Sequence, residues 1–316
     1  MRIIAGDVGG TKTLLQFVDR GAVVAERRYE STRYPTFDAL LNEFLPYCEP
    51  PIDAACFAVA GPVLDQRAEI TNVGWSIDAR QLSAAFGIDA IALINDFYAV
   101  ALGVPLLTPT ERLSLNAGTR RPRDPIAILG AGTGLGEATL IWSAEQWNVI
   151  PSEGGHADFA PQDQLQSRLF LALLAKYGHV SWERLVSGMG LVNIHNFLGG
   201  SVTDGAEVAA LAARGDATAL QTFSIFVDIY GAEAGNMGLR VLARGGVFLA
   251  GGIAAKNTKY FTDGRFMAAF LRKGRFRELL AEMPVDLITN EKVGLLGAAE
   301  MARRIAAKGW GMRDEG

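Results

Sequence analysis

The chain has 316 residues, of which 49% are hydrophobic and 20% are charged. This composition excludes an intrinsically disordered protein, and the length is enough for about two domains. A net charge of −4 and a pI near 5.5 argue against nucleic acid as a partner. No apolar stretch approaches the ~20 residues that span a bilayer, and the first residues lack the layout of a signal peptide. We therefore expect a cytoplasmic protein with no membrane or nucleic-acid partner.

Hydrophobic periodicity predicts a mixed α/β fold. A helix near 165–177 is expected to end at Gly178, and a long helical pattern near 217–243 contains three glycines, which predicts close packing or a break there. In chain order, strands are predicted near residues 2–6, 13–18, 54–59, 91–94, 126–129, 138–142 and 247–250, and helices near 37–46, 78–86, 165–177, 207–213, 217–243 and 294–307.

Three glycine clusters, at 6–11, 130–136 and 251–253, directly follow predicted strands. Glycines at a strand end expose backbone N–H groups, which favours a bound polyphosphate. Neither a Walker A loop nor the dinucleotide fingerprint matches. Asp7 would repel phosphates unless a divalent cation lay between them, so it predicts Mg²⁺ held through water. The alternative for each cluster is an ordinary tight turn.

The pattern of strand, glycine turn and strand near 2–18 recurs near 126–142. This recurrence predicts two related halves that direct their phosphate-binding turns toward one cleft.

Asn95 and Asp96 follow the predicted strand 91–94 and precede a helical segment. A carboxylate at the carboxyl end of a buried strand points to where open α/β sheets bind ligands, and it can accept a hydroxyl proton during phosphoryl transfer. The neighbouring amide suits a sugar hydroxyl. The alternative is helix capping, for which Asn and Asp are both preferred.

Glu153, His156 and Asp158 share a glycine-containing loop. A metal site needs three or four converging ligands, and no cysteine is present here to provide one. Carboxylate and imidazole groups that bind the hydroxyls of a polar ligand therefore fit better. Glu183 is a further candidate, with an exposed helical charge as the alternative.

The remaining reactive side chains indicate no competing site. Cys48 and Cys56 are too few for a zinc cage, and Cys56 lies in an apolar run typical of a core. His179 follows a helix-ending glycine and is expected to be structural, while His195 has no assigned role. The chain contains no Gly-x-Ser-x-Gly elbow, which argues against acyl transfer.

Ten short segments, distributed in order over nearly the whole chain, carry a further signal: 6–11, 58–62, 71–75, 94–97, 130–136, 153–161, 178–184, 187–191, 248–253 and 294–297. In these segments the chain resembles the bacterial glucokinases of the hexokinase/actin/chaperone-ATPase superfamily. One departure is Lys12, where asparagine is usual in this group; the related repressor/sugar-kinase group has lysine there but also a cysteine-rich zinc motif that this chain lacks.

The resemblance implies two actin-like (ribonuclease H-like) α/β domains with a cleft between them, formed by residues 1–106 with 297–316 and by residues 107–296. It implies ATP-dependent phosphorylation of D-glucose to glucose 6-phosphate by a homodimeric enzyme. The alternatives are a kinase for another hexose, such as mannose, fructose or an amino sugar, and a non-catalytic sugar sensor.

The resemblance also implies roles for particular residues. Asp96 would be the catalytic base toward the sugar 6-hydroxyl, and the backbone near Gly61 would line the sugar pocket. Sugar binding would involve Asn72, Asn95, Asp96, Glu153, His156 and Glu183. ATP binding would involve Gly6, Asp7, Val8, Gly9, Gly10, Thr11, Gly132, Thr133, Gly134, Gly251 and Gly252, with Asp7 toward Mg²⁺.

Overall fold

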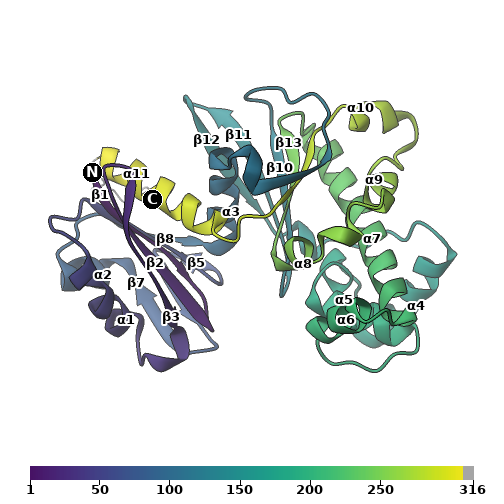
Figure 1. Ribbon diagram of the computed structural model, residues 1–316, viewed down its shortest axis with the longest axis horizontal. Helices are drawn as coiled ribbons and strands as arrows, with labels where there is room; N and C mark the ends of the chain where they lie inside the picture. The colour runs from purple at the N-terminus through teal and green to yellow at the C-terminus, as the bar shows by residue number, and fades with distance from the viewer. Residues whose placement is uncertain (309–316) are drawn as a thin grey trace. The chain divides into compact units, whose positions relative to one another are not determined.

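A computed structural model describes residues 1–308, which form two compact units. The first unit comprises residues 1–107 and the described residues from Lys292 onward, and the second comprises residues 108–291. Each unit is built around one mixed β-sheet with helices packed against it (Figure 1).

The sheet of the first unit has the strand order β3-β2-β1-β4-β8. The central strand β1 pairs antiparallel with β2 and parallel with β4, and β4 pairs parallel with β8. The strands are β1 (Arg2–Val8), β2 (Lys12–Asp19), β3 (Ala22–Glu30), β4 (Ala54–Val59) and β8 (Ile91–Asn95).

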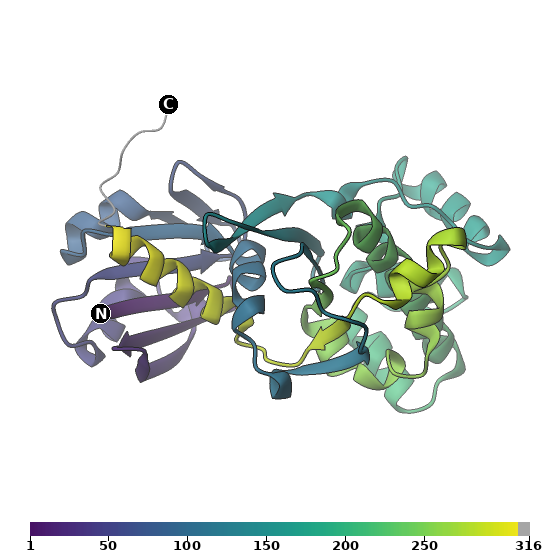
Figure 2. The ribbon, with the colours of Figure 1, turned by 90° about the horizontal axis from the view of Figure 1, so that it is seen from above.

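Alternating side chains of β1 and β4 pack into two cores on opposite faces of this sheet. One face, which includes Ile4 and Phe57, packs against α1 (Phe37–Phe44), α2 (Ala79–Phe86) and the small sheet of β5 (Val63–Leu64), β6 (Arg67–Ile70) and β7 (Trp75–Asp78). The other face, which includes Ile3 and Cys56, is covered by α11 (Val293–Lys308), which runs beside α3 (Asp96–Gly103) (Figure 2). Cys56 is fully buried, which confirms its prediction as a core residue.

The sheet of the second unit has the order β12-β11-β10-β13-β14-β9. Its first five strands repeat the topology of the first sheet: three antiparallel strands, then two that join in parallel. The predicted recurrence is therefore a repeat of the whole sheet. The strands are β9 (Arg112–Asn116), β10 (Ile126–Ala131), β11 (Leu135–Ser143), β12 (Gln146–Ser152), β13 (Gly246–Ala250) and β14 (Val285–Ile288).

Helix α7 is the centre of the second unit's core, where Phe226 and Tyr230 pack with Leu129 and Val247 of the sheet. Gly178 ends α4 in the left-handed region, with a φ of +74°, as predicted. The helices of this unit are α4 (Gln164–Tyr177), α5 (Gly188–Phe197), α6 (Gly205–Ala213), α7 (Ala217–Val241), α8 (Gly252–Lys256), α9 (Arg265–Phe270) and α10 (Arg277–Ala281).

The glycines of α7 allow close packing and do not break the helix, which runs continuously over 25 residues. A Cβ at Gly231 would overlap the carbonyl oxygen of Phe266 in α9, and a Cβ at Gly235 would overlap that of Phe270. Of the two alternatives predicted from the sequence, the structure therefore shows close packing.

We expect Gly231→Ala to lower the free energy of unfolding by about 1–3 kcal/mol, because α9 must move to admit the methyl group. This figure is the net loss: the helix preference for alanine over glycine, about 1 kcal/mol, offsets part of a larger cost of the clash with the α9 backbone. Urea denaturation measures the change. Gln221→Ala, at an exposed position of the same helix, is the control and should stay within about 0.5 kcal/mol of the parent. An unchanged midpoint in Gly231→Ala would contradict the packing argument.

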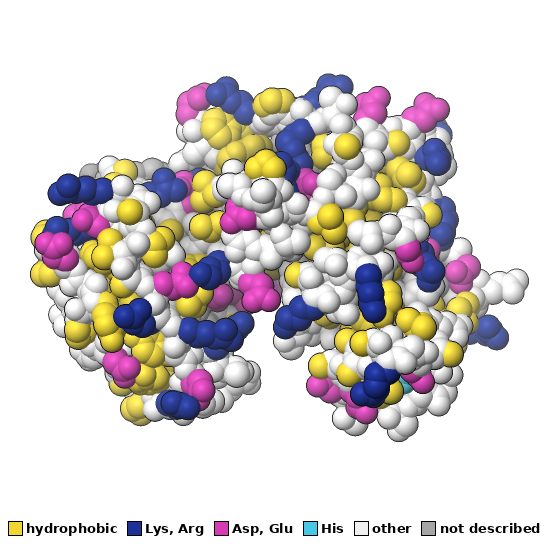
Figure 3. All heavy atoms as spheres, in the orientation of Figure 1, with side chains coloured by type: hydrophobic (Ala, Val, Ile, Leu, Met, Phe, Trp, Pro, Cys, Tyr) yellow, Lys and Arg dark blue, Asp and Glu magenta, His cyan; other side chains and the backbone are white. Residues whose placement is uncertain are grey.

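On the face that Figure 3 displays, Lys and Arg side chains are interspersed with Asp and Glu. Among the described helices, none is both long and apolar enough to cross a membrane.

Candidate functional site

Two carboxylates lie at the carboxyl end of the first unit's sheet. Asp7 is near the end of β1, and Asp96 directly follows β8. Both are half-buried, and burial is the main cause that raises the pKa of each carboxyl group. The Asp7 charge raises the pKa of Asp96 further, and Lys12 partly offsets the rise at Asp7. A carboxylate with a raised pKa is a better proton acceptor than an ordinary one.

Asn95 fixes the position of Asp96. Its Oδ1 accepts hydrogen bonds from the backbone N–H groups of Phe97 (2.9 Å) and Tyr98 (3.1 Å), which caps α3. Its Nδ2 donates to the carbonyl of Gly61 and to Oδ1 of Asp96, both at 3.0 Å. These four bonds use the full capacity of the amide. Capping and a role at the site are therefore not exclusive, and a sugar hydroxyl could bond to Asn95 only in exchange for one of these partners.

The turn between β1 and β2 presents backbone at the same end of the sheet. Gly9 donates its N–H to the carbonyl of Lys12 (3.0 Å), and a Cβ at Gly10 would lie 2.8 Å from Cβ of Asn72. Asn72 thus lies against this turn, which also contains the exposed Thr11. Gly6 and Val8 are different: both are buried strand residues. The missing side chain of Gly6 makes room for Leu15 and Phe57, so its glycine has a packing reason.

The second unit has a corresponding turn between β10 and β11. Gly132 donates to the carbonyl of Gly134 (2.8 Å), and Thr133 is exposed at the tip. The loop is shorter than the glycine pattern indicates, because Gly130 and Gly136 face each other as paired strand residues.

Gly251 lies next to this turn, at the end of β13. Its φ is +88°, and a Cβ there would overlap the carbonyl oxygen of Ala131. Two glycine-containing segments that are distant in the sequence therefore meet at one end of the sheet, and Gly252 then begins α8. Such adjacent bare backbone suits a nucleotide.

Three of the predicted sugar-binding side chains come together in the second unit. Nε2 of His156 lies 3.8 Å from Oε2 of Glu153, and its Nδ1 lies 3.9 Å from Oε1 of Glu183. The side chains of Glu153 and His156 are largely exposed, whereas that of Glu183 is about one third exposed. Oε2 of Glu183 accepts a hydrogen bond from the backbone N–H of Leu135 (2.9 Å), which connects this cluster to the β10–β11 turn.

Asp158, the remaining residue of the predicted loop cluster, does not join these three side chains. Oδ1 of Asp158 is 2.9 Å from Nε2 of His179, so Asp158 is engaged there and not with His156. Within residues 1–308, no group of three or more His, Cys, Asp or Glu side chains is placed to hold a metal. His195 is buried, with Nδ1 3.2 Å from Oγ1 of Thr222, which is a structural role.

Sequence reasoning missed Glu137 of β11. Its side chain is only 2% exposed, and it lies beneath the loop that carries Glu153 and His156. A single glutamate in an otherwise largely apolar strand was the only available signal.

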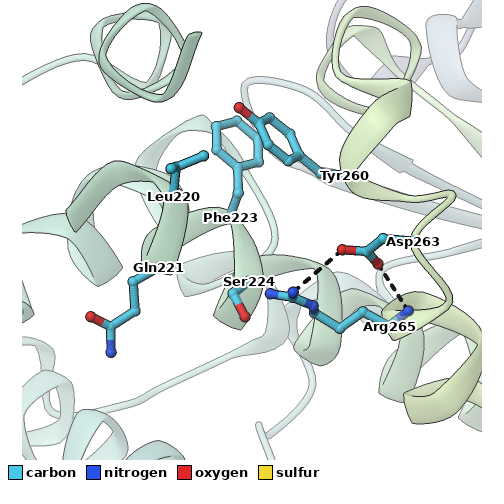
Figure 4. A pocket seen from close by; sticks show the side chains of 7 residues that line it. All are labelled: Leu220, Gln221, Phe223, Ser224, Tyr260, Asp263 and Arg265. Carbon is cyan, nitrogen blue, oxygen red and sulfur yellow. Dashed lines mark hydrogen bonds and ion pairs between the residues drawn. The ribbon is translucent and has the colours of Figure 1, made fainter. Parts of the chain in front are cut away.

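A cavity of about 440 Å³ lies elsewhere in the second unit, between the first half of α7 and the segment that follows α8. Tyr260 stacks on Phe223 at one side of it, and Arg265 pairs with Asp263 at the other (Figure 4). None of the predicted site residues lines it.

The glucokinase family model matches residues 4–305. The chain belongs to the glucokinase family. It is 41% identical to the glucokinase of Nostoc sp., over 96% of this chain and 99% of that relative. Among solved structures, it is similar to a glucokinase from an Antarctic psychrotroph, with a TM-score of 0.88 and 29% identity over 96% of this chain and 99% of that one.

A more distant similarity supports the fold alone. A ROK-family glucokinase from Streptomyces griseus, solved in complex with glucose and AMPPNP, has a TM-score of 0.66 and is 20% identical over 96% of this chain and all of that one. The predicted fold class, two actin-like α/β domains, is confirmed by these structural relatives of the glucokinase family.

Proposed function

We propose that this chain, as a member of the glucokinase family, transfers the γ-phosphoryl group of ATP to the 6-hydroxyl of D-glucose, with Asp96 as the general base. The observation that carries the role of Asp96 is its setting. It is a half-buried carboxylate at a strand end, held by Asn95 and by the Phe97 N–H, with a pKa raised by burial and by Asp7.

In the proposed step, the Asp96 carboxylate takes the proton of the 6-hydroxyl as its oxygen bonds to the γ-phosphorus. The bond from that phosphorus to the β–γ bridging oxygen breaks, and ADP leaves with the electron pair. Such a base raises the rate of phosphoryl transfer by a factor of roughly 10²–10⁴, provided that the hydroxyl is held within hydrogen-bond reach.

The other hydroxyls of the sugar are assigned to Glu153, His156 and Glu183 of the second unit, as the family resemblance implies. The His156 imidazole lies within 4 Å of a carboxylate oxygen of Glu153 and of one of Glu183, and this mixture of acceptors and an imidazole supports binding of a polyhydroxylated ligand. Asn72 and Asn95 are assigned to the same sugar.

The ATP phosphates are assigned to the two glycine turns, and the adenosine to the Gly251–Gly252 segment. Asp7 fits a Mg²⁺ ion held through water. It is an oxygen donor near the end of β1, beside the glycine turn, and its negative charge adds to that of Asp96. A site of one or two carboxylates completed by phosphates is what Mg²⁺ prefers. The ion would neutralise phosphate charge, while Asp7 orients it.

Three expectations from the sequence accompany this proposal. We place the reaction in the cytoplasm, because ATP is its substrate. We assign the chain to a homodimer, as the resemblance implies. The boundaries of the two domains, 1–106 with 297–316 and 107–296, also stay a prediction.

Release of ADP by the purified protein tests the function. With ATP and Mg²⁺, we expect a high rate with glucose and almost none without sugar, because the site requires a hydroxyl to accept the phosphoryl group. Mannose, fructose and N-acetylglucosamine serve as comparison sugars in the same assay. A faster rate with one of these would identify that sugar, and not glucose, as the preferred substrate. No sugar-dependent rate at all would overturn the proposed function.

A further inference from the structure

Glu137 is a buried carboxyl group that the proposed chemistry does not use. It lies on β11 directly opposite Ser152 of β12. Neither of its carboxylate oxygens has a hydrogen-bond partner among the residues that the structure describes, and the side chain is 2% exposed. An ionised carboxylate in such a place is costly, because it has lost its water and gained no hydrogen bond in return.

The group supports the turn that carries the sugar-binding side chains. β12 ends at Ser152, and residues 154–156 form a single 3-10 turn flanked by Glu153 and containing His156. A Cβ at Gly154 would overlap Oε2 of Glu137, so the carboxyl group contacts the backbone of this turn directly. Gly154 also donates its N–H to Oγ of Ser152 (2.9 Å). The Glu137 carboxyl group therefore limits how closely the backbone of the turn can approach the sheet.

The other side of Glu137 faces α7, whose charged groups are already paired. Nη1 of Arg240 donates to Oε1 of Glu233 at 2.6 Å, and Asn236 donates to Oε2 of the same residue at 2.7 Å. Arg240 is therefore bonded to Glu233 and makes no hydrogen bond to Glu137. The charged and titratable groups that act on it are Glu233, Arg240 and Tyr230 of α7; the turn adds Glu153 and His156, whose side chains are largely exposed.

We propose that Glu137 is a positioning residue that holds the turn in its sugar-binding conformation while it is a neutral carboxylic acid, and that its ionisation displaces the turn and weakens glucose binding. The inference rests on the proposed function, because glucose is the ligand of this turn.

The direction of the pH dependence follows from burial. Burial raises the pKa of Glu137 to about 7; the Glu233 carboxylate adds to the rise, and Arg240 opposes it. Glu137 is therefore neutral below about pH 7 and becomes ionised above it. Ionisation favours any movement that admits water to the carboxylate, and Gly154 is the backbone that lies over it. Glucose affinity should accordingly fall as the pH rises through 7.

Calorimetric titration of the full chain with glucose alone, between about pH 6 and pH 8, tests this. We expect the Kd of the parent protein to rise about threefold to tenfold, since a pKa that glucose raises by one unit changes affinity tenfold. Glu137→Gln keeps the shape of the neutral acid and cannot ionise, so its Kd should stay constant. Glu145→Gln is the matched control, an exposed glutamate in the hairpin that joins the same two strands, and it should behave as the parent does.

Glu137→Met, which is apolar and of similar volume, provides a second non-ionisable variant should the amide disturb folding. A Kd that rises equally in the parent and in both variants would overturn the inference while leaving the proposed function intact. Absence of glucose binding at every pH, together with absence of sugar-dependent ADP release, would overturn the proposed function itself.

Discussion

Asp96→Asn is expected to lower kcat by roughly 10²–10⁴ while leaving the Kd for glucose within a few-fold of the parent value. Asparagine preserves the side-chain oxygen that accepts hydrogen bonds from the Phe97 N–H and from the Asn95 amide, so the local structure should be kept. It cannot accept the proton of the 6-hydroxyl. Steady-state ADP release and calorimetric titration with glucose separate the two effects.

Asp89→Asn is the control for this substitution, because Asp89 is an exposed residue of the same unit. Its kinetic constants should match those of the parent. Unchanged turnover in Asp96→Asn would exclude Asp96 as the base. Loss of glucose binding along with turnover would instead reassign Asp96 to substrate binding.

Gly134→Ala is expected to raise the KM for glucose roughly 10- to 100-fold, the effect of losing hydrogen bonds to a charged group. The new Cβ would overlap Oε2 of Glu183, and the end of that flexible side chain can move away more readily than backbone can. The carboxylate then loses the Leu135 N–H and leaves the neighbourhood of His156. Initial rates at varied glucose concentrations measure the change.

Gly294→Ala is the matched control, because a Cβ there makes only ordinary van der Waals contact, 3.6 Å from Cγ2 of Val100. It should leave the KM for glucose unchanged. If Gly134→Ala retained the parent KM, Glu183 would not bind the sugar through the conformation seen here. A large fall in thermal stability would show that the turn, and not the side chain, had given way.

The central strands and the glycine turns could be predicted from the sequence because buried parallel strands are continuous apolar runs that end abruptly in glycine. The edge strands β3 and β12 could not. β3 is mostly exposed and carries Glu26, Arg27 and Arg28, so it lacks the apolar signal of a strand. β14 could not be predicted for a different reason. It contains Asp286, a charged residue that is buried only because Arg112 and Arg120 pair with it from elsewhere in the chain.

The residues of the candidate site also divide into those that a local sequence pattern indicates and those that it does not. Asp96, Glu153, His156 and Glu183 are polar residues in glycine-rich or strand-end contexts, which is a local signal. The contact of Glu183 with Gly134 joins residues 49 positions apart, and no local pattern encodes it. Glu137 was overlooked because a glutamate in a strand normally faces water, and only the packing of the turn and of α7 reveals that this one does not.

Helix α11 has a consequence for biosynthesis. Its side chains Leu295, Ala298, Ala302 and Ile305 complete the core on one face of the first unit's sheet, yet they are made after the entire second unit. At 5–20 residues per second, the ribosome needs on the order of 10–40 s to pass from residue 107 to the end of α11. During that interval the nascent sheet has an uncovered apolar face. The second unit, which is continuous in sequence, can fold first, so the amino-terminal part of the nascent chain is the part that a chaperone would have to protect.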